Sequence, residues 1–281
     1  MIQDIAPHKL HNEYHPEKVC VPSDTVICVR ENSLLVAEGR EEICFPRREN
    51  LPREIACRYL FSIDEEDFYL AEDFRGEVTG FSFMSLRDIR YQLQGPQRLM
   101  YAAYTAYHLA LWYRDNRFCG RCGERTAHSE KERALKCPHC GHMIYPRLMP
   151  AVIVGVINGE SILMTKYANR PMSFYALIAG FTEIGETLEE CVAREVMEEA
   201  GLKVKNLRYY KSQPWGSVQD LLMGFYCEVD GDDTIHLERE ELKEGRWVPR
   251  EEIQGQKDDL SLTNEMMMVF KAGKEPRAFE G

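Results

Sequence analysis

The sequence predicts a layered protein that mixes strands and helices, in the α/β or α+β class, with a small metal-binding segment inside the chain. Three observations support this. The length of 281 residues suggests about two average domains. Strand-like and helix-like segments alternate in both halves. A short cysteine-rich stretch separates the halves and is too small to own a hydrophobic core. We therefore expect domains at 1–115, 116–147 and 148–281.

The first of these regions is expected to be an α+β domain. Short β-like runs at 24–30 and 33–37 alternate with turn-forming stretches. A helix is predicted from about Pro96 to Tyr113, where Ala, Leu and Tyr recur at helical spacing.

Charge and composition exclude several classes of protein. The chain is 44% hydrophobic, so a wholly disordered protein is not expected. It carries 35 basic and 46 acidic side chains and a net charge of −11. Such a surface repels polyphosphate and lacks the basic footprint of a general nucleic-acid binder. An anionic substrate must then be met by metal ions or by a few well-placed cations.

Apolar runs and cysteine usage indicate a cytoplasmic protein that does not cross a membrane. The longest apolar run, Leu148 to Ile157, is too short to span a bilayer, and the first residues lack the apolar core of a secretory signal. Four of the ten cysteines form two tight pairs and the other six are scattered. That usage fits free thiols and a metal site better than a disulfide framework.

The cysteine segment predicts a structural zinc site. Cys119 and Cys122 form one Cys-x-x-Cys pair, Cys137 and Cys140 form another, and fourteen residues separate the pairs. Four thiolates in this spacing suit tetrahedral zinc and leave no coordination position for water. A redox dithiol is the alternative, which the pairing disfavours. A zinc ribbon can also bind nucleic acid, although the loop 124–136 has mixed charges.

The third region opens with the clearest local signal, a β-hairpin. Alternating apolar runs at 151–157 and 161–165 flank Asn158-Gly159, which favours a type I′ turn. Further strands are expected near 174–178, 205–211 and 221–229, and helices at 188–200 and 262–272.

The helix predicted at 188–200 carries an acidic face. Thr187 and Glu190 form a capping box at its start, and Gly201 ends it. Glu195, Glu198 and Glu199 lie at positions i, i+3 and i+4, on one face. A solvated acidic surface is the simple alternative. The adjoining apolar side of the helix and the glycine-containing loop 179–186 favour instead an oxygen-ligand site for Mg²⁺ or Mn²⁺.

This stretch resembles the Nudix hydrolases, whose pattern is G-x₅-E-x₇-R-E-U-x-E-E-x-G-U with U aliphatic. It is met without a departure at Gly180, Glu186, Arg194, Glu195, Val196, Glu198, Glu199, Gly201 and Leu202. The resemblance implies an α/β/α sandwich with a mixed sheet, and metal-dependent cleavage of a diphosphate. It implies that Glu195 and Glu199 are metal ligands, with Glu198 close by and the Ala179 carbonyl as a further ligand.

The resemblance also implies supporting roles within the same site. The residue that matches Arg194 orients a glutamate in the family. Arg194 and Glu186 are therefore expected to support the metal ligands. In the family, a glutamate that lies six residues before a tryptophan reaches the metals. In this chain that position is Glu241, which lies six residues before Trp247. Glu198 and Glu241 stay open as alternatives for the general base.

The order of parts is similar to the NADH pyrophosphatase branch of that family. A zinc ribbon is followed by Tyr145-Pro-Arg, the glutamate pattern and Ser212-Gln-Pro-Trp. That branch cleaves NAD(H) to nicotinamide mononucleotide and AMP, some members remove NAD caps from RNA, and members are commonly homodimers. The implied substrate contacts are aromatic stacking by Tyr145 and Phe181, the segment Gln213, Pro214 and Trp215, Gln219, and the basic residues Arg87 and Arg47.

One segment departs from the branch. The family motif continues as SQPWPFPxS, whereas this chain reads Ser212-Gln-Pro-Trp-Gly216-Ser-Val-Gln-Asp220. The loss of Pro-Phe-Pro makes another diphosphate, such as ADP-ribose, the alternative substrate. A ligand sensor or RNA-binding protein that uses the zinc ribbon for recognition is the third hypothesis, which the intact glutamates disfavour.

Overall fold

The computed structural model describes residues 1–168 and 174–277, which divide into two compact units. The N-terminal unit contains Ile2–Arg147 together with the short segment Trp215–Gln219. The C-terminal unit contains Met1, Leu148–Pro214 and the residues from Asp220 onward. The segment at 215–219 therefore leaves the C-terminal unit for five residues and then returns to it.

Two small sheets form the body of the N-terminal unit. One has the strand order β1-β5-β6-β2 and the other has the order β3-β4-β7. Both expected β-runs form strands. The run at 24–30 is divided at Cys28 into two strands, and the run at 33–37 forms one. The strands are β1 (Leu10–His11), β2 (Thr25–Ile27), β3 (Val29–Arg30), β4 (Ser33–Ala37), β5 (Cys57–Ile63), β6 (Glu66–Ala71) and β7 (Phe81–Ser85), with a 3₁₀ turn, η1, at Arg48–Asn50.

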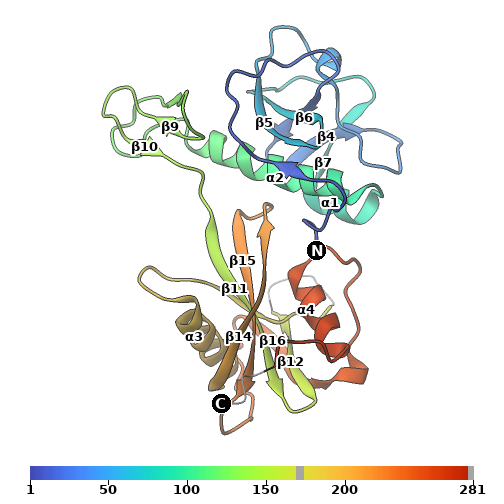
Figure 1. Cartoon of the computed structure of the whole chain (residues 1–281), viewed down its shortest axis with the longest axis vertical. Helices are drawn as coiled ribbons and strands as arrows, with labels where there is room; N and C mark the ends of the chain where they lie inside the picture. Colours follow the sequence, from blue (N-terminus) through green and yellow to red (C-terminus); the bar gives the residue numbers. More distant parts are fainter. Residues whose placement is uncertain (169–173, 278–281) are drawn as a thin grey trace. The chain divides into compact units, whose positions relative to one another are not determined.

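Two helices follow these sheets (Figure 1). Ser85 caps α1 (Leu86–Gln92) by accepting a hydrogen bond from the Asp88 N–H. The longer helix α2 (Gln97–Asp115) confirms the helix expected from Pro96, and Pro96 itself is its N-cap. The unit closes with three two-residue strands in the cysteine segment, β8 (Ala127–His128), β9 (Leu135–Lys136) and β10 (Met143–Ile144).

A mixed six-stranded sheet organises the C-terminal unit. Its order is β14-β15-β11-β12-β16, and β13 pairs with the N-terminal half of β11. The central pair β11·β15 is parallel, whereas β11·β12, β11·β13 and β12·β16 are antiparallel. The strands are β11 (Met149–Asn158), β12 (Ser161–Tyr167), β13 (Ile178–Phe181), β14 (Val204–Trp215), β15 (Asp220–Val229) and β16 (Leu242–Pro249), and η2 follows at Arg250–Glu252.

The two remaining helices cover opposite faces of this sheet (Figure 1). The apolar side of α3 (Leu188–Ala200) packs on Val152, Val154 and Val156 of β11. On the other face, α4 (Leu262–Lys271) packs on Ile153 and Ile157 of the same strand. Alternate residues of β11 thus serve two cores, as a sheet buried on both faces requires. The expected α/β/α sandwich with a mixed sheet is confirmed.

Two local expectations in this unit are wrong. The strand expected at 174–178 begins only at Ile178, and Ala176 makes a single bridge to Thr165. The hairpin turn consists of Gly159 and Glu160, because Asn158 still pairs with Ser161. Of these two residues the structure gives a positive φ only for Gly159, whereas a type I′ turn needs it at both.

Within the described residues, no helix combines the length and the apolar character that crossing a bilayer would require.

Candidate functional site

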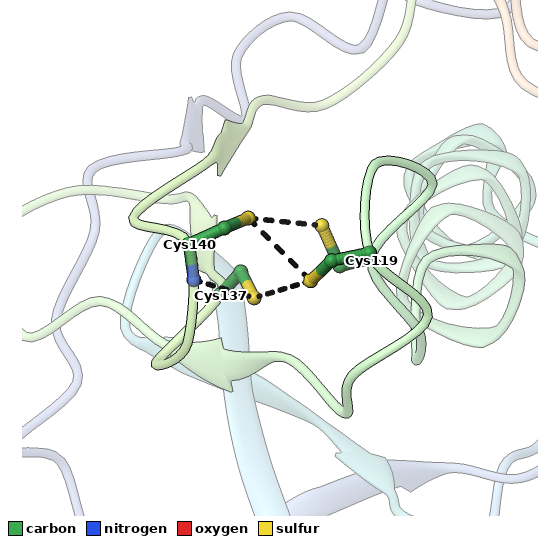
Figure 2. Close-up of side chains that lie close together, drawn as sticks. Cys119, Cys137 and Cys140 are labelled. Carbon is green, nitrogen blue, oxygen red and sulfur yellow. Dashed lines mark hydrogen bonds between the residues drawn. The ribbon is translucent and has the colours of Figure 1, made fainter.

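The four predicted zinc ligands lie together in the N-terminal unit. The Sγ atoms of Cys119, Cys122, Cys137 and Cys140 all lie within 4.8 Å of one another. Figure 2 shows the side chains of Cys119, Cys137 and Cys140 pointing toward one another. The Cys122–Cys137 and Cys122–Cys140 separations are 3.4 and 3.5 Å, and Cys119–Cys140 is 3.6 Å. A tetrahedral zinc site with Zn–S bonds of about 2.3 Å has S···S edges of about 3.8 Å, so the cluster fits zinc closely.

Backbone turns hold each cysteine pair in place. The Gly123 N–H donates to the Cys119 carbonyl, and the Gly141 N–H donates to the Cys137 carbonyl. Both glycines have φ above 70°, in the left-handed region that favours glycine. The Cys140 N–H also points at the Cys137 sulfur, and this bond lowers the pKa of that thiol to about 6. A thiolate at neutral pH is the form that binds zinc.

In the C-terminal unit, local signals position the glutamate helix. Thr187 accepts from the Glu190 N–H while the Glu190 carboxylate accepts from the Thr187 N–H, so the predicted capping box is present. Gly201 ends α3 with φ of 70°. These two ends bound the helix at the residues expected from the sequence, and they fix which face presents Glu195 and Glu199.

The Glu195 carboxylate rests directly on the backbone of β13. A Cβ atom built on Gly180 would lie 1.9 Å from Glu195 Cδ, a distance that no real contact allows. Gly180 is therefore required because the carboxylate occupies the space of a side chain. Glu195 is 9% exposed and Glu199 is 2% exposed, so two of the three helical glutamates are buried.

Arg194 neutralises part of this acidic cluster. Its guanidinium lies 2.8 Å from Glu186, 2.7 Å from Glu195 and 3.0 Å from Glu198, and it also donates to the Phe181 carbonyl. The bonds from Arg194 lower the pKa of Glu186 to about 2. Arg194 thus ties the loop, the strand end and the helix together, which agrees with its expected orienting role.

Glu199 has an unsatisfied carboxylate oxygen. Its Oε2 is buried and has no hydrogen-bond partner among the residues that the structure describes. Burial raises its pKa to about 8, and the nearby charges of Glu195, Glu241 and Glu198 add to the effect, while a backbone hydrogen bond from Ala179 opposes it. Burial raises the pKa of Glu195 as well. Two buried carboxylates that repel one another, one of which has an oxygen without a partner, are suited to a divalent cation.

Glu241 is held near the end of α3 by the backbone. The Glu238 N–H donates to the Glu199 carbonyl, the Glu241 N–H donates to the Glu238 carbonyl, and the Glu241 carbonyl accepts from Ala168. Glu241 is exposed, and Glu198 has 59% of its side chain exposed. Among the described residues, the glutamate oxygens do not form a group of three within 4.8 Å, because Arg194 holds Glu195 and Glu198 in ion pairs.

Both predicted stacking residues present their rings to solvent. Phe181 is 52% exposed at the end of β13, directly after Gly180. Tyr145 is 55% exposed in the N-terminal unit, and its hydroxyl donates to Glu132. Large exposed aromatic side chains of this kind are available to stack on a planar ring.

Gln213, which was expected to contact the substrate, does not lie at the surface. Its side chain is fully buried, its amide nitrogen donates to the Leu260 carbonyl, and its amide oxygen accepts from the Leu262 N–H. Gln213 therefore fixes the start of α4, and Pro214 is half-buried beside it. Any effect of Gln213 on a substrate would pass through the position of that helix.

The departing segment 215–219 packs on α2 within the N-terminal unit. The Trp215 ring lies 5.0 Å from the Tyr104 ring, and Arg90 lies over its face at 5.1 Å. A Cβ atom on Gly216 would lie 2.1 Å from the Tyr104 carbonyl oxygen, so glycine permits this close approach. Gln219, with φ of 66°, accepts two hydrogen bonds from the Arg147 guanidinium.

The two predicted basic contacts differ in their availability. Arg87 is exposed in the first turn of α1. Arg47 donates to Thr25 at 2.5 Å and pairs with Glu66 at 3.3 Å, so its guanidinium already has partners in the fold.

A separate cavity of about 570 Å³ lies within the N-terminal unit. Its lining includes Arg75, Arg125, Tyr113 and His128. The predicted site residues are not among its described lining residues, so it is distinct from the glutamate cluster.

Asp220 was missed by the sequence analysis. It opens β15, it is 6% exposed, and its Oδ1 is buried with no partner in the described part of the chain. Its position inside the segment that departs from the family motif was the available signal.

We expect one zinc ion per chain, and we expect Cys137→Ser to lose it, because three thiolates and a hydroxyl hold zinc far more weakly. Elemental analysis and thermal melting should show zinc loss and unfolding of the ribbon. Cys44→Ser, which changes a cysteine outside the cluster, should retain zinc. Full zinc content in Cys137→Ser would contradict the assignment.

Glu199 should make the protein without added divalent cation less stable as pH rises. The pKa of Glu199 is about 8 in the folded chain and its ordinary value is 4.5, so the folded chain keeps a proton that the unfolded chain releases. The free energy of unfolding therefore falls between pH 4.5 and about 8, and levels off above that.

Glu199→Gln removes this effect, since an amide does not ionise. Thermal melts should show the variant more stable than wild type at pH 8.5, with the difference shrinking toward pH 5, and added Mg²⁺ should stabilise only wild type. Glu189→Gln, an exposed change on the same helix, is the control. Equal pH dependence in wild type and Glu199→Gln would contradict the prediction.

Comparison with known proteins finds matches for the C-terminal domain and for the cysteine segment. The NUDIX domain model matches residues 147–267, and the NADH pyrophosphatase zinc ribbon domain model matches residues 114–145. Three relatives bear the name NAD-capped RNA hydrolase NudC. The protein from Escherichia fergusonii is 41% identical over 56% of this chain and 60% of its own length. The one from Salmonella schwarzengrund is 39% identical over 59% and 64%, and the one from Escherichia coli is 42% identical over 52% and 56%.

The matched region spans less than two thirds of the length of each of these relatives. Among solved structures, the chain is similar to a NUDIX hydrolase from Nitrosomonas europaea, with 27% identity, a TM-score of 0.43, and coverage of 49% of this chain and 80% of that one. The two domain-model matches show that the chain contains a Nudix domain, preceded by a zinc ribbon of the NADH pyrophosphatase type.

Proposed function

We propose that this protein hydrolyses the diphosphate linkage of NAD(H), which yields nicotinamide mononucleotide and AMP. The observation that carries the proposal is the buried Glu195–Glu199 pair against Gly180, in a Nudix domain that follows an NADH pyrophosphatase zinc ribbon. The name of the relatives, NAD-capped RNA hydrolase, supports NAD-capped RNA as a second form of the substrate.

The glutamate cluster would hold the catalytic metal. Glu195 and Glu199, with the Ala179 carbonyl, would bind Mg²⁺ or Mn²⁺, and Glu198 and Glu241 lie beside them. When bound, the metal supplies charge neutralisation at the phosphoryl oxygens and a bound water of lowered pKa. Arg194 holds Glu186 and positions the ligating carboxylates before the metal arrives.

Water would attack one phosphorus in line with the departing phosphate, and a carboxylate would take its proton. Glu198 and Glu241 are the two groups for this task, since both are exposed while Glu195 and Glu199 are buried as ligands. Closed by four thiolates, the zinc would stabilise the ribbon and take no part in this step.

Recognition of the substrate rings would come from Phe181 and Tyr145, whose exposed faces can stack on nicotinamide or adenine. Trp215, Gln219 and Arg87 belong to the same proposed set of contacts.

We further propose a homodimer in which both copies help to form the ring pocket. We propose a division into domains at 1–115, 116–147 and 148–281. We also propose a cytoplasmic location, which the ten cysteines without disulfide bonds support.

ADP-ribose is the second candidate substrate. Gly216-Ser-Val replaces the Pro-Phe-Pro of the resembled motif, and Gly216 is packed against the α2 backbone. A pocket reshaped in this way would lose rigid contacts to the second nucleotide and would accept a simpler diphosphate.

Product analysis tests the proposal directly. With Mg²⁺ or Mn²⁺, wild type should convert NADH to reduced nicotinamide mononucleotide and AMP, detected by chromatography, and Glu199→Gln should lose several orders of magnitude in kcat. ADP-ribose at matched concentration is the comparison. A higher kcat/KM for ADP-ribose than for NADH would favour the second candidate, and no hydrolysis of either would overturn the assignment.

Tyr145→Ala should chiefly raise KM for NADH. Base–aromatic stacking contributes roughly 1–3 kcal/mol, which corresponds to a loss of about 5- to 150-fold. Tyr209→Ala removes a tyrosine of similar exposure, 53% against 55%, from the outer strand β14 and should leave KM unchanged. An unchanged KM in Tyr145→Ala would remove that ring from the proposed contacts.

A further inference from the structure

The cavity of about 570 Å³ in the N-terminal unit has a positively charged wall. Its described lining contains five arginines against three acidic residues, which leaves a local excess of two positive charges. The whole chain, by contrast, has a net charge of −11. A cleft lined by one sign of charge attracts ligands of the opposite sign, because its low-dielectric walls concentrate the field. This cavity is therefore suited to an anion on a protein whose surface otherwise repels anions.

Three of these arginines have no acidic partner among the described residues. The side chains of Arg75 and Arg125 are exposed and make no hydrogen bond or ion pair in the described part of the chain. Arg30 donates to the carbonyl oxygens of Arg75 and Gly76, at 2.9 and 2.6 Å, and lies over the Phe83 ring at 4.0 Å. These contacts hold Arg30 in place and leave its charge uncompensated.

The acidic residues of the wall are mostly neutralised by other groups. Glu72 pairs with Arg58 at 2.6 Å, and Asp73 pairs with Arg117 at 2.7 Å. Within the described ranges, Glu31 is the one acidic lining residue whose carboxylate has no ion pair. An anion that enters the cavity thus meets more free guanidinium groups than free carboxylates.

Contacts between distant segments bring the two free arginines to the same cavity. Arg75 follows β6, whereas Arg125 belongs to the cysteine segment. Arg117, which begins that segment, forms its ion pair with Asp73, two residues before Arg75. The N–H of Thr126, the residue after Arg125, donates to the Arg117 carbonyl at 3.0 Å. The loop after β6 and the cysteine segment therefore form adjoining parts of the wall.

The first cysteine pair fixes the backbone that carries Arg125. The Cys119 N–H donates to the Glu124 carbonyl at 2.8 Å, and Arg125 forms a β-bridge with Phe118. The ribbon thus has a second use besides its own stability, since it supplies one wall of a cavity that the two small sheets leave open.

The size of the cavity allows a ligand larger than a simple ion. Sites for small molecules usually have volumes of roughly 300–1,000 Å³, and this cavity lies within that range. Its wall also includes Leu111 of α2 and the neighbouring Tyr113. A phosphate group that contacts the arginines would leave room for an organic body beside these residues.

We propose that this cavity binds a phosphate group, either as free phosphate or as the phosphate of a small ester such as a nucleoside monophosphate. Arg75 and Arg125 are its main ligands, with Arg30 beside them. A guanidinium presents two parallel N–H donors to phosphate oxygens, and its charge strengthens both hydrogen bonds. The site goes beyond the proposed hydrolysis, because none of the predicted catalytic, metal-binding or substrate-binding residues belongs to its described lining.

Isothermal titration calorimetry of the full chain tests the proposal, in a buffer without phosphate and without added divalent cation. The probes are inorganic phosphate, adenosine monophosphate and adenosine. Both phosphate probes should bind at one site per chain, and adenosine should not bind. Tighter binding of adenosine monophosphate identifies an ester as the ligand, and equal or weaker binding identifies the free ion. Adenosine that binds as tightly as adenosine monophosphate, or no binding of either phosphate probe at millimolar concentration, would overturn the inference.

The double variant Arg75→Gln/Arg125→Gln locates the bound phosphate. It should weaken binding of the phosphate probes at least about tenfold, because hydrogen bonds to charged groups are among the strongest in proteins. Both side chains are exposed and unpartnered in the described residues, so the fold should be retained, which thermal melting checks.

Arg40→Gln/Arg53→Gln is the matched control. It removes two exposed arginines of the same unit that lie outside the cavity, and it should bind the probes as wild type does. Unchanged affinity in Arg75→Gln/Arg125→Gln would place the phosphate elsewhere and overturn the inference. Equal weakening in both double variants would also overturn it, since the effect would then come from net charge. No outcome depends on cleavage of NAD(H), so the proposed function is tested separately.

Discussion

The contact between Gly180 and the Glu195 carboxylate is the constraint on which the rest of the site depends. It brings a charged side chain to within van der Waals distance of a strand backbone, which only a residue without a Cβ permits. The contact places α3 against β13, and it buries Glu195 and Glu199 together. Two buried carboxylates on adjacent turns are unfavourable without a counter-charge. Arg194 supplies part of that charge, and the unpartnered Glu199 oxygen marks where a cation would supply the remainder.

The single strand β13 carries residues of two parts of the proposed site. Residues 179 and 180 offer backbone to the glutamate cluster, and Phe181 offers a ring to the opposite face. Because strand residues alternate, a diphosphate held on one side of the strand end and a planar ring on the other are only a few ångströms apart. This geometry suits a dinucleotide, in which a charged linkage joins two rings.

The segment that departs from the resembled motif makes close contacts within the N-terminal unit. Gly216 packs against the Tyr104 carbonyl, and Trp215 rests on Tyr104 and Arg90, so residues 215–219 form part of the N-terminal unit. A proline at position 216 would bring ring atoms into the space that the Tyr104 carbonyl fills. Glycine at position 216 therefore allows the close contact with Tyr104 that proline would not.

The sequence by itself determined the features that a few neighbouring residues encode. Thr187, Glu190 and Gly201 bound α3 at the expected residues, and the spacing of the cysteine pairs identified the thiolate cluster. The order of strands and helices predicted a layered α/β or α+β domain, and the resemblance to the Nudix hydrolases implied the sandwich. These signals are local because capping boxes, left-handed glycines and paired knuckles each span no more than a few positions.

Tertiary structure alone decided what depends on pairing between distant segments. The strand was expected at 174–178, whereas pairing with β11 places it at Ile178–Phe181. Burial of Gln213 depends on α4, about fifty residues further along the chain. The burial of Asp220 at the start of β15 depends on strands that meet only in the folded sheet. No local pattern encodes such contacts. The groups that bury a polar atom, and those that could form a hydrogen bond with it, come from remote parts of the chain.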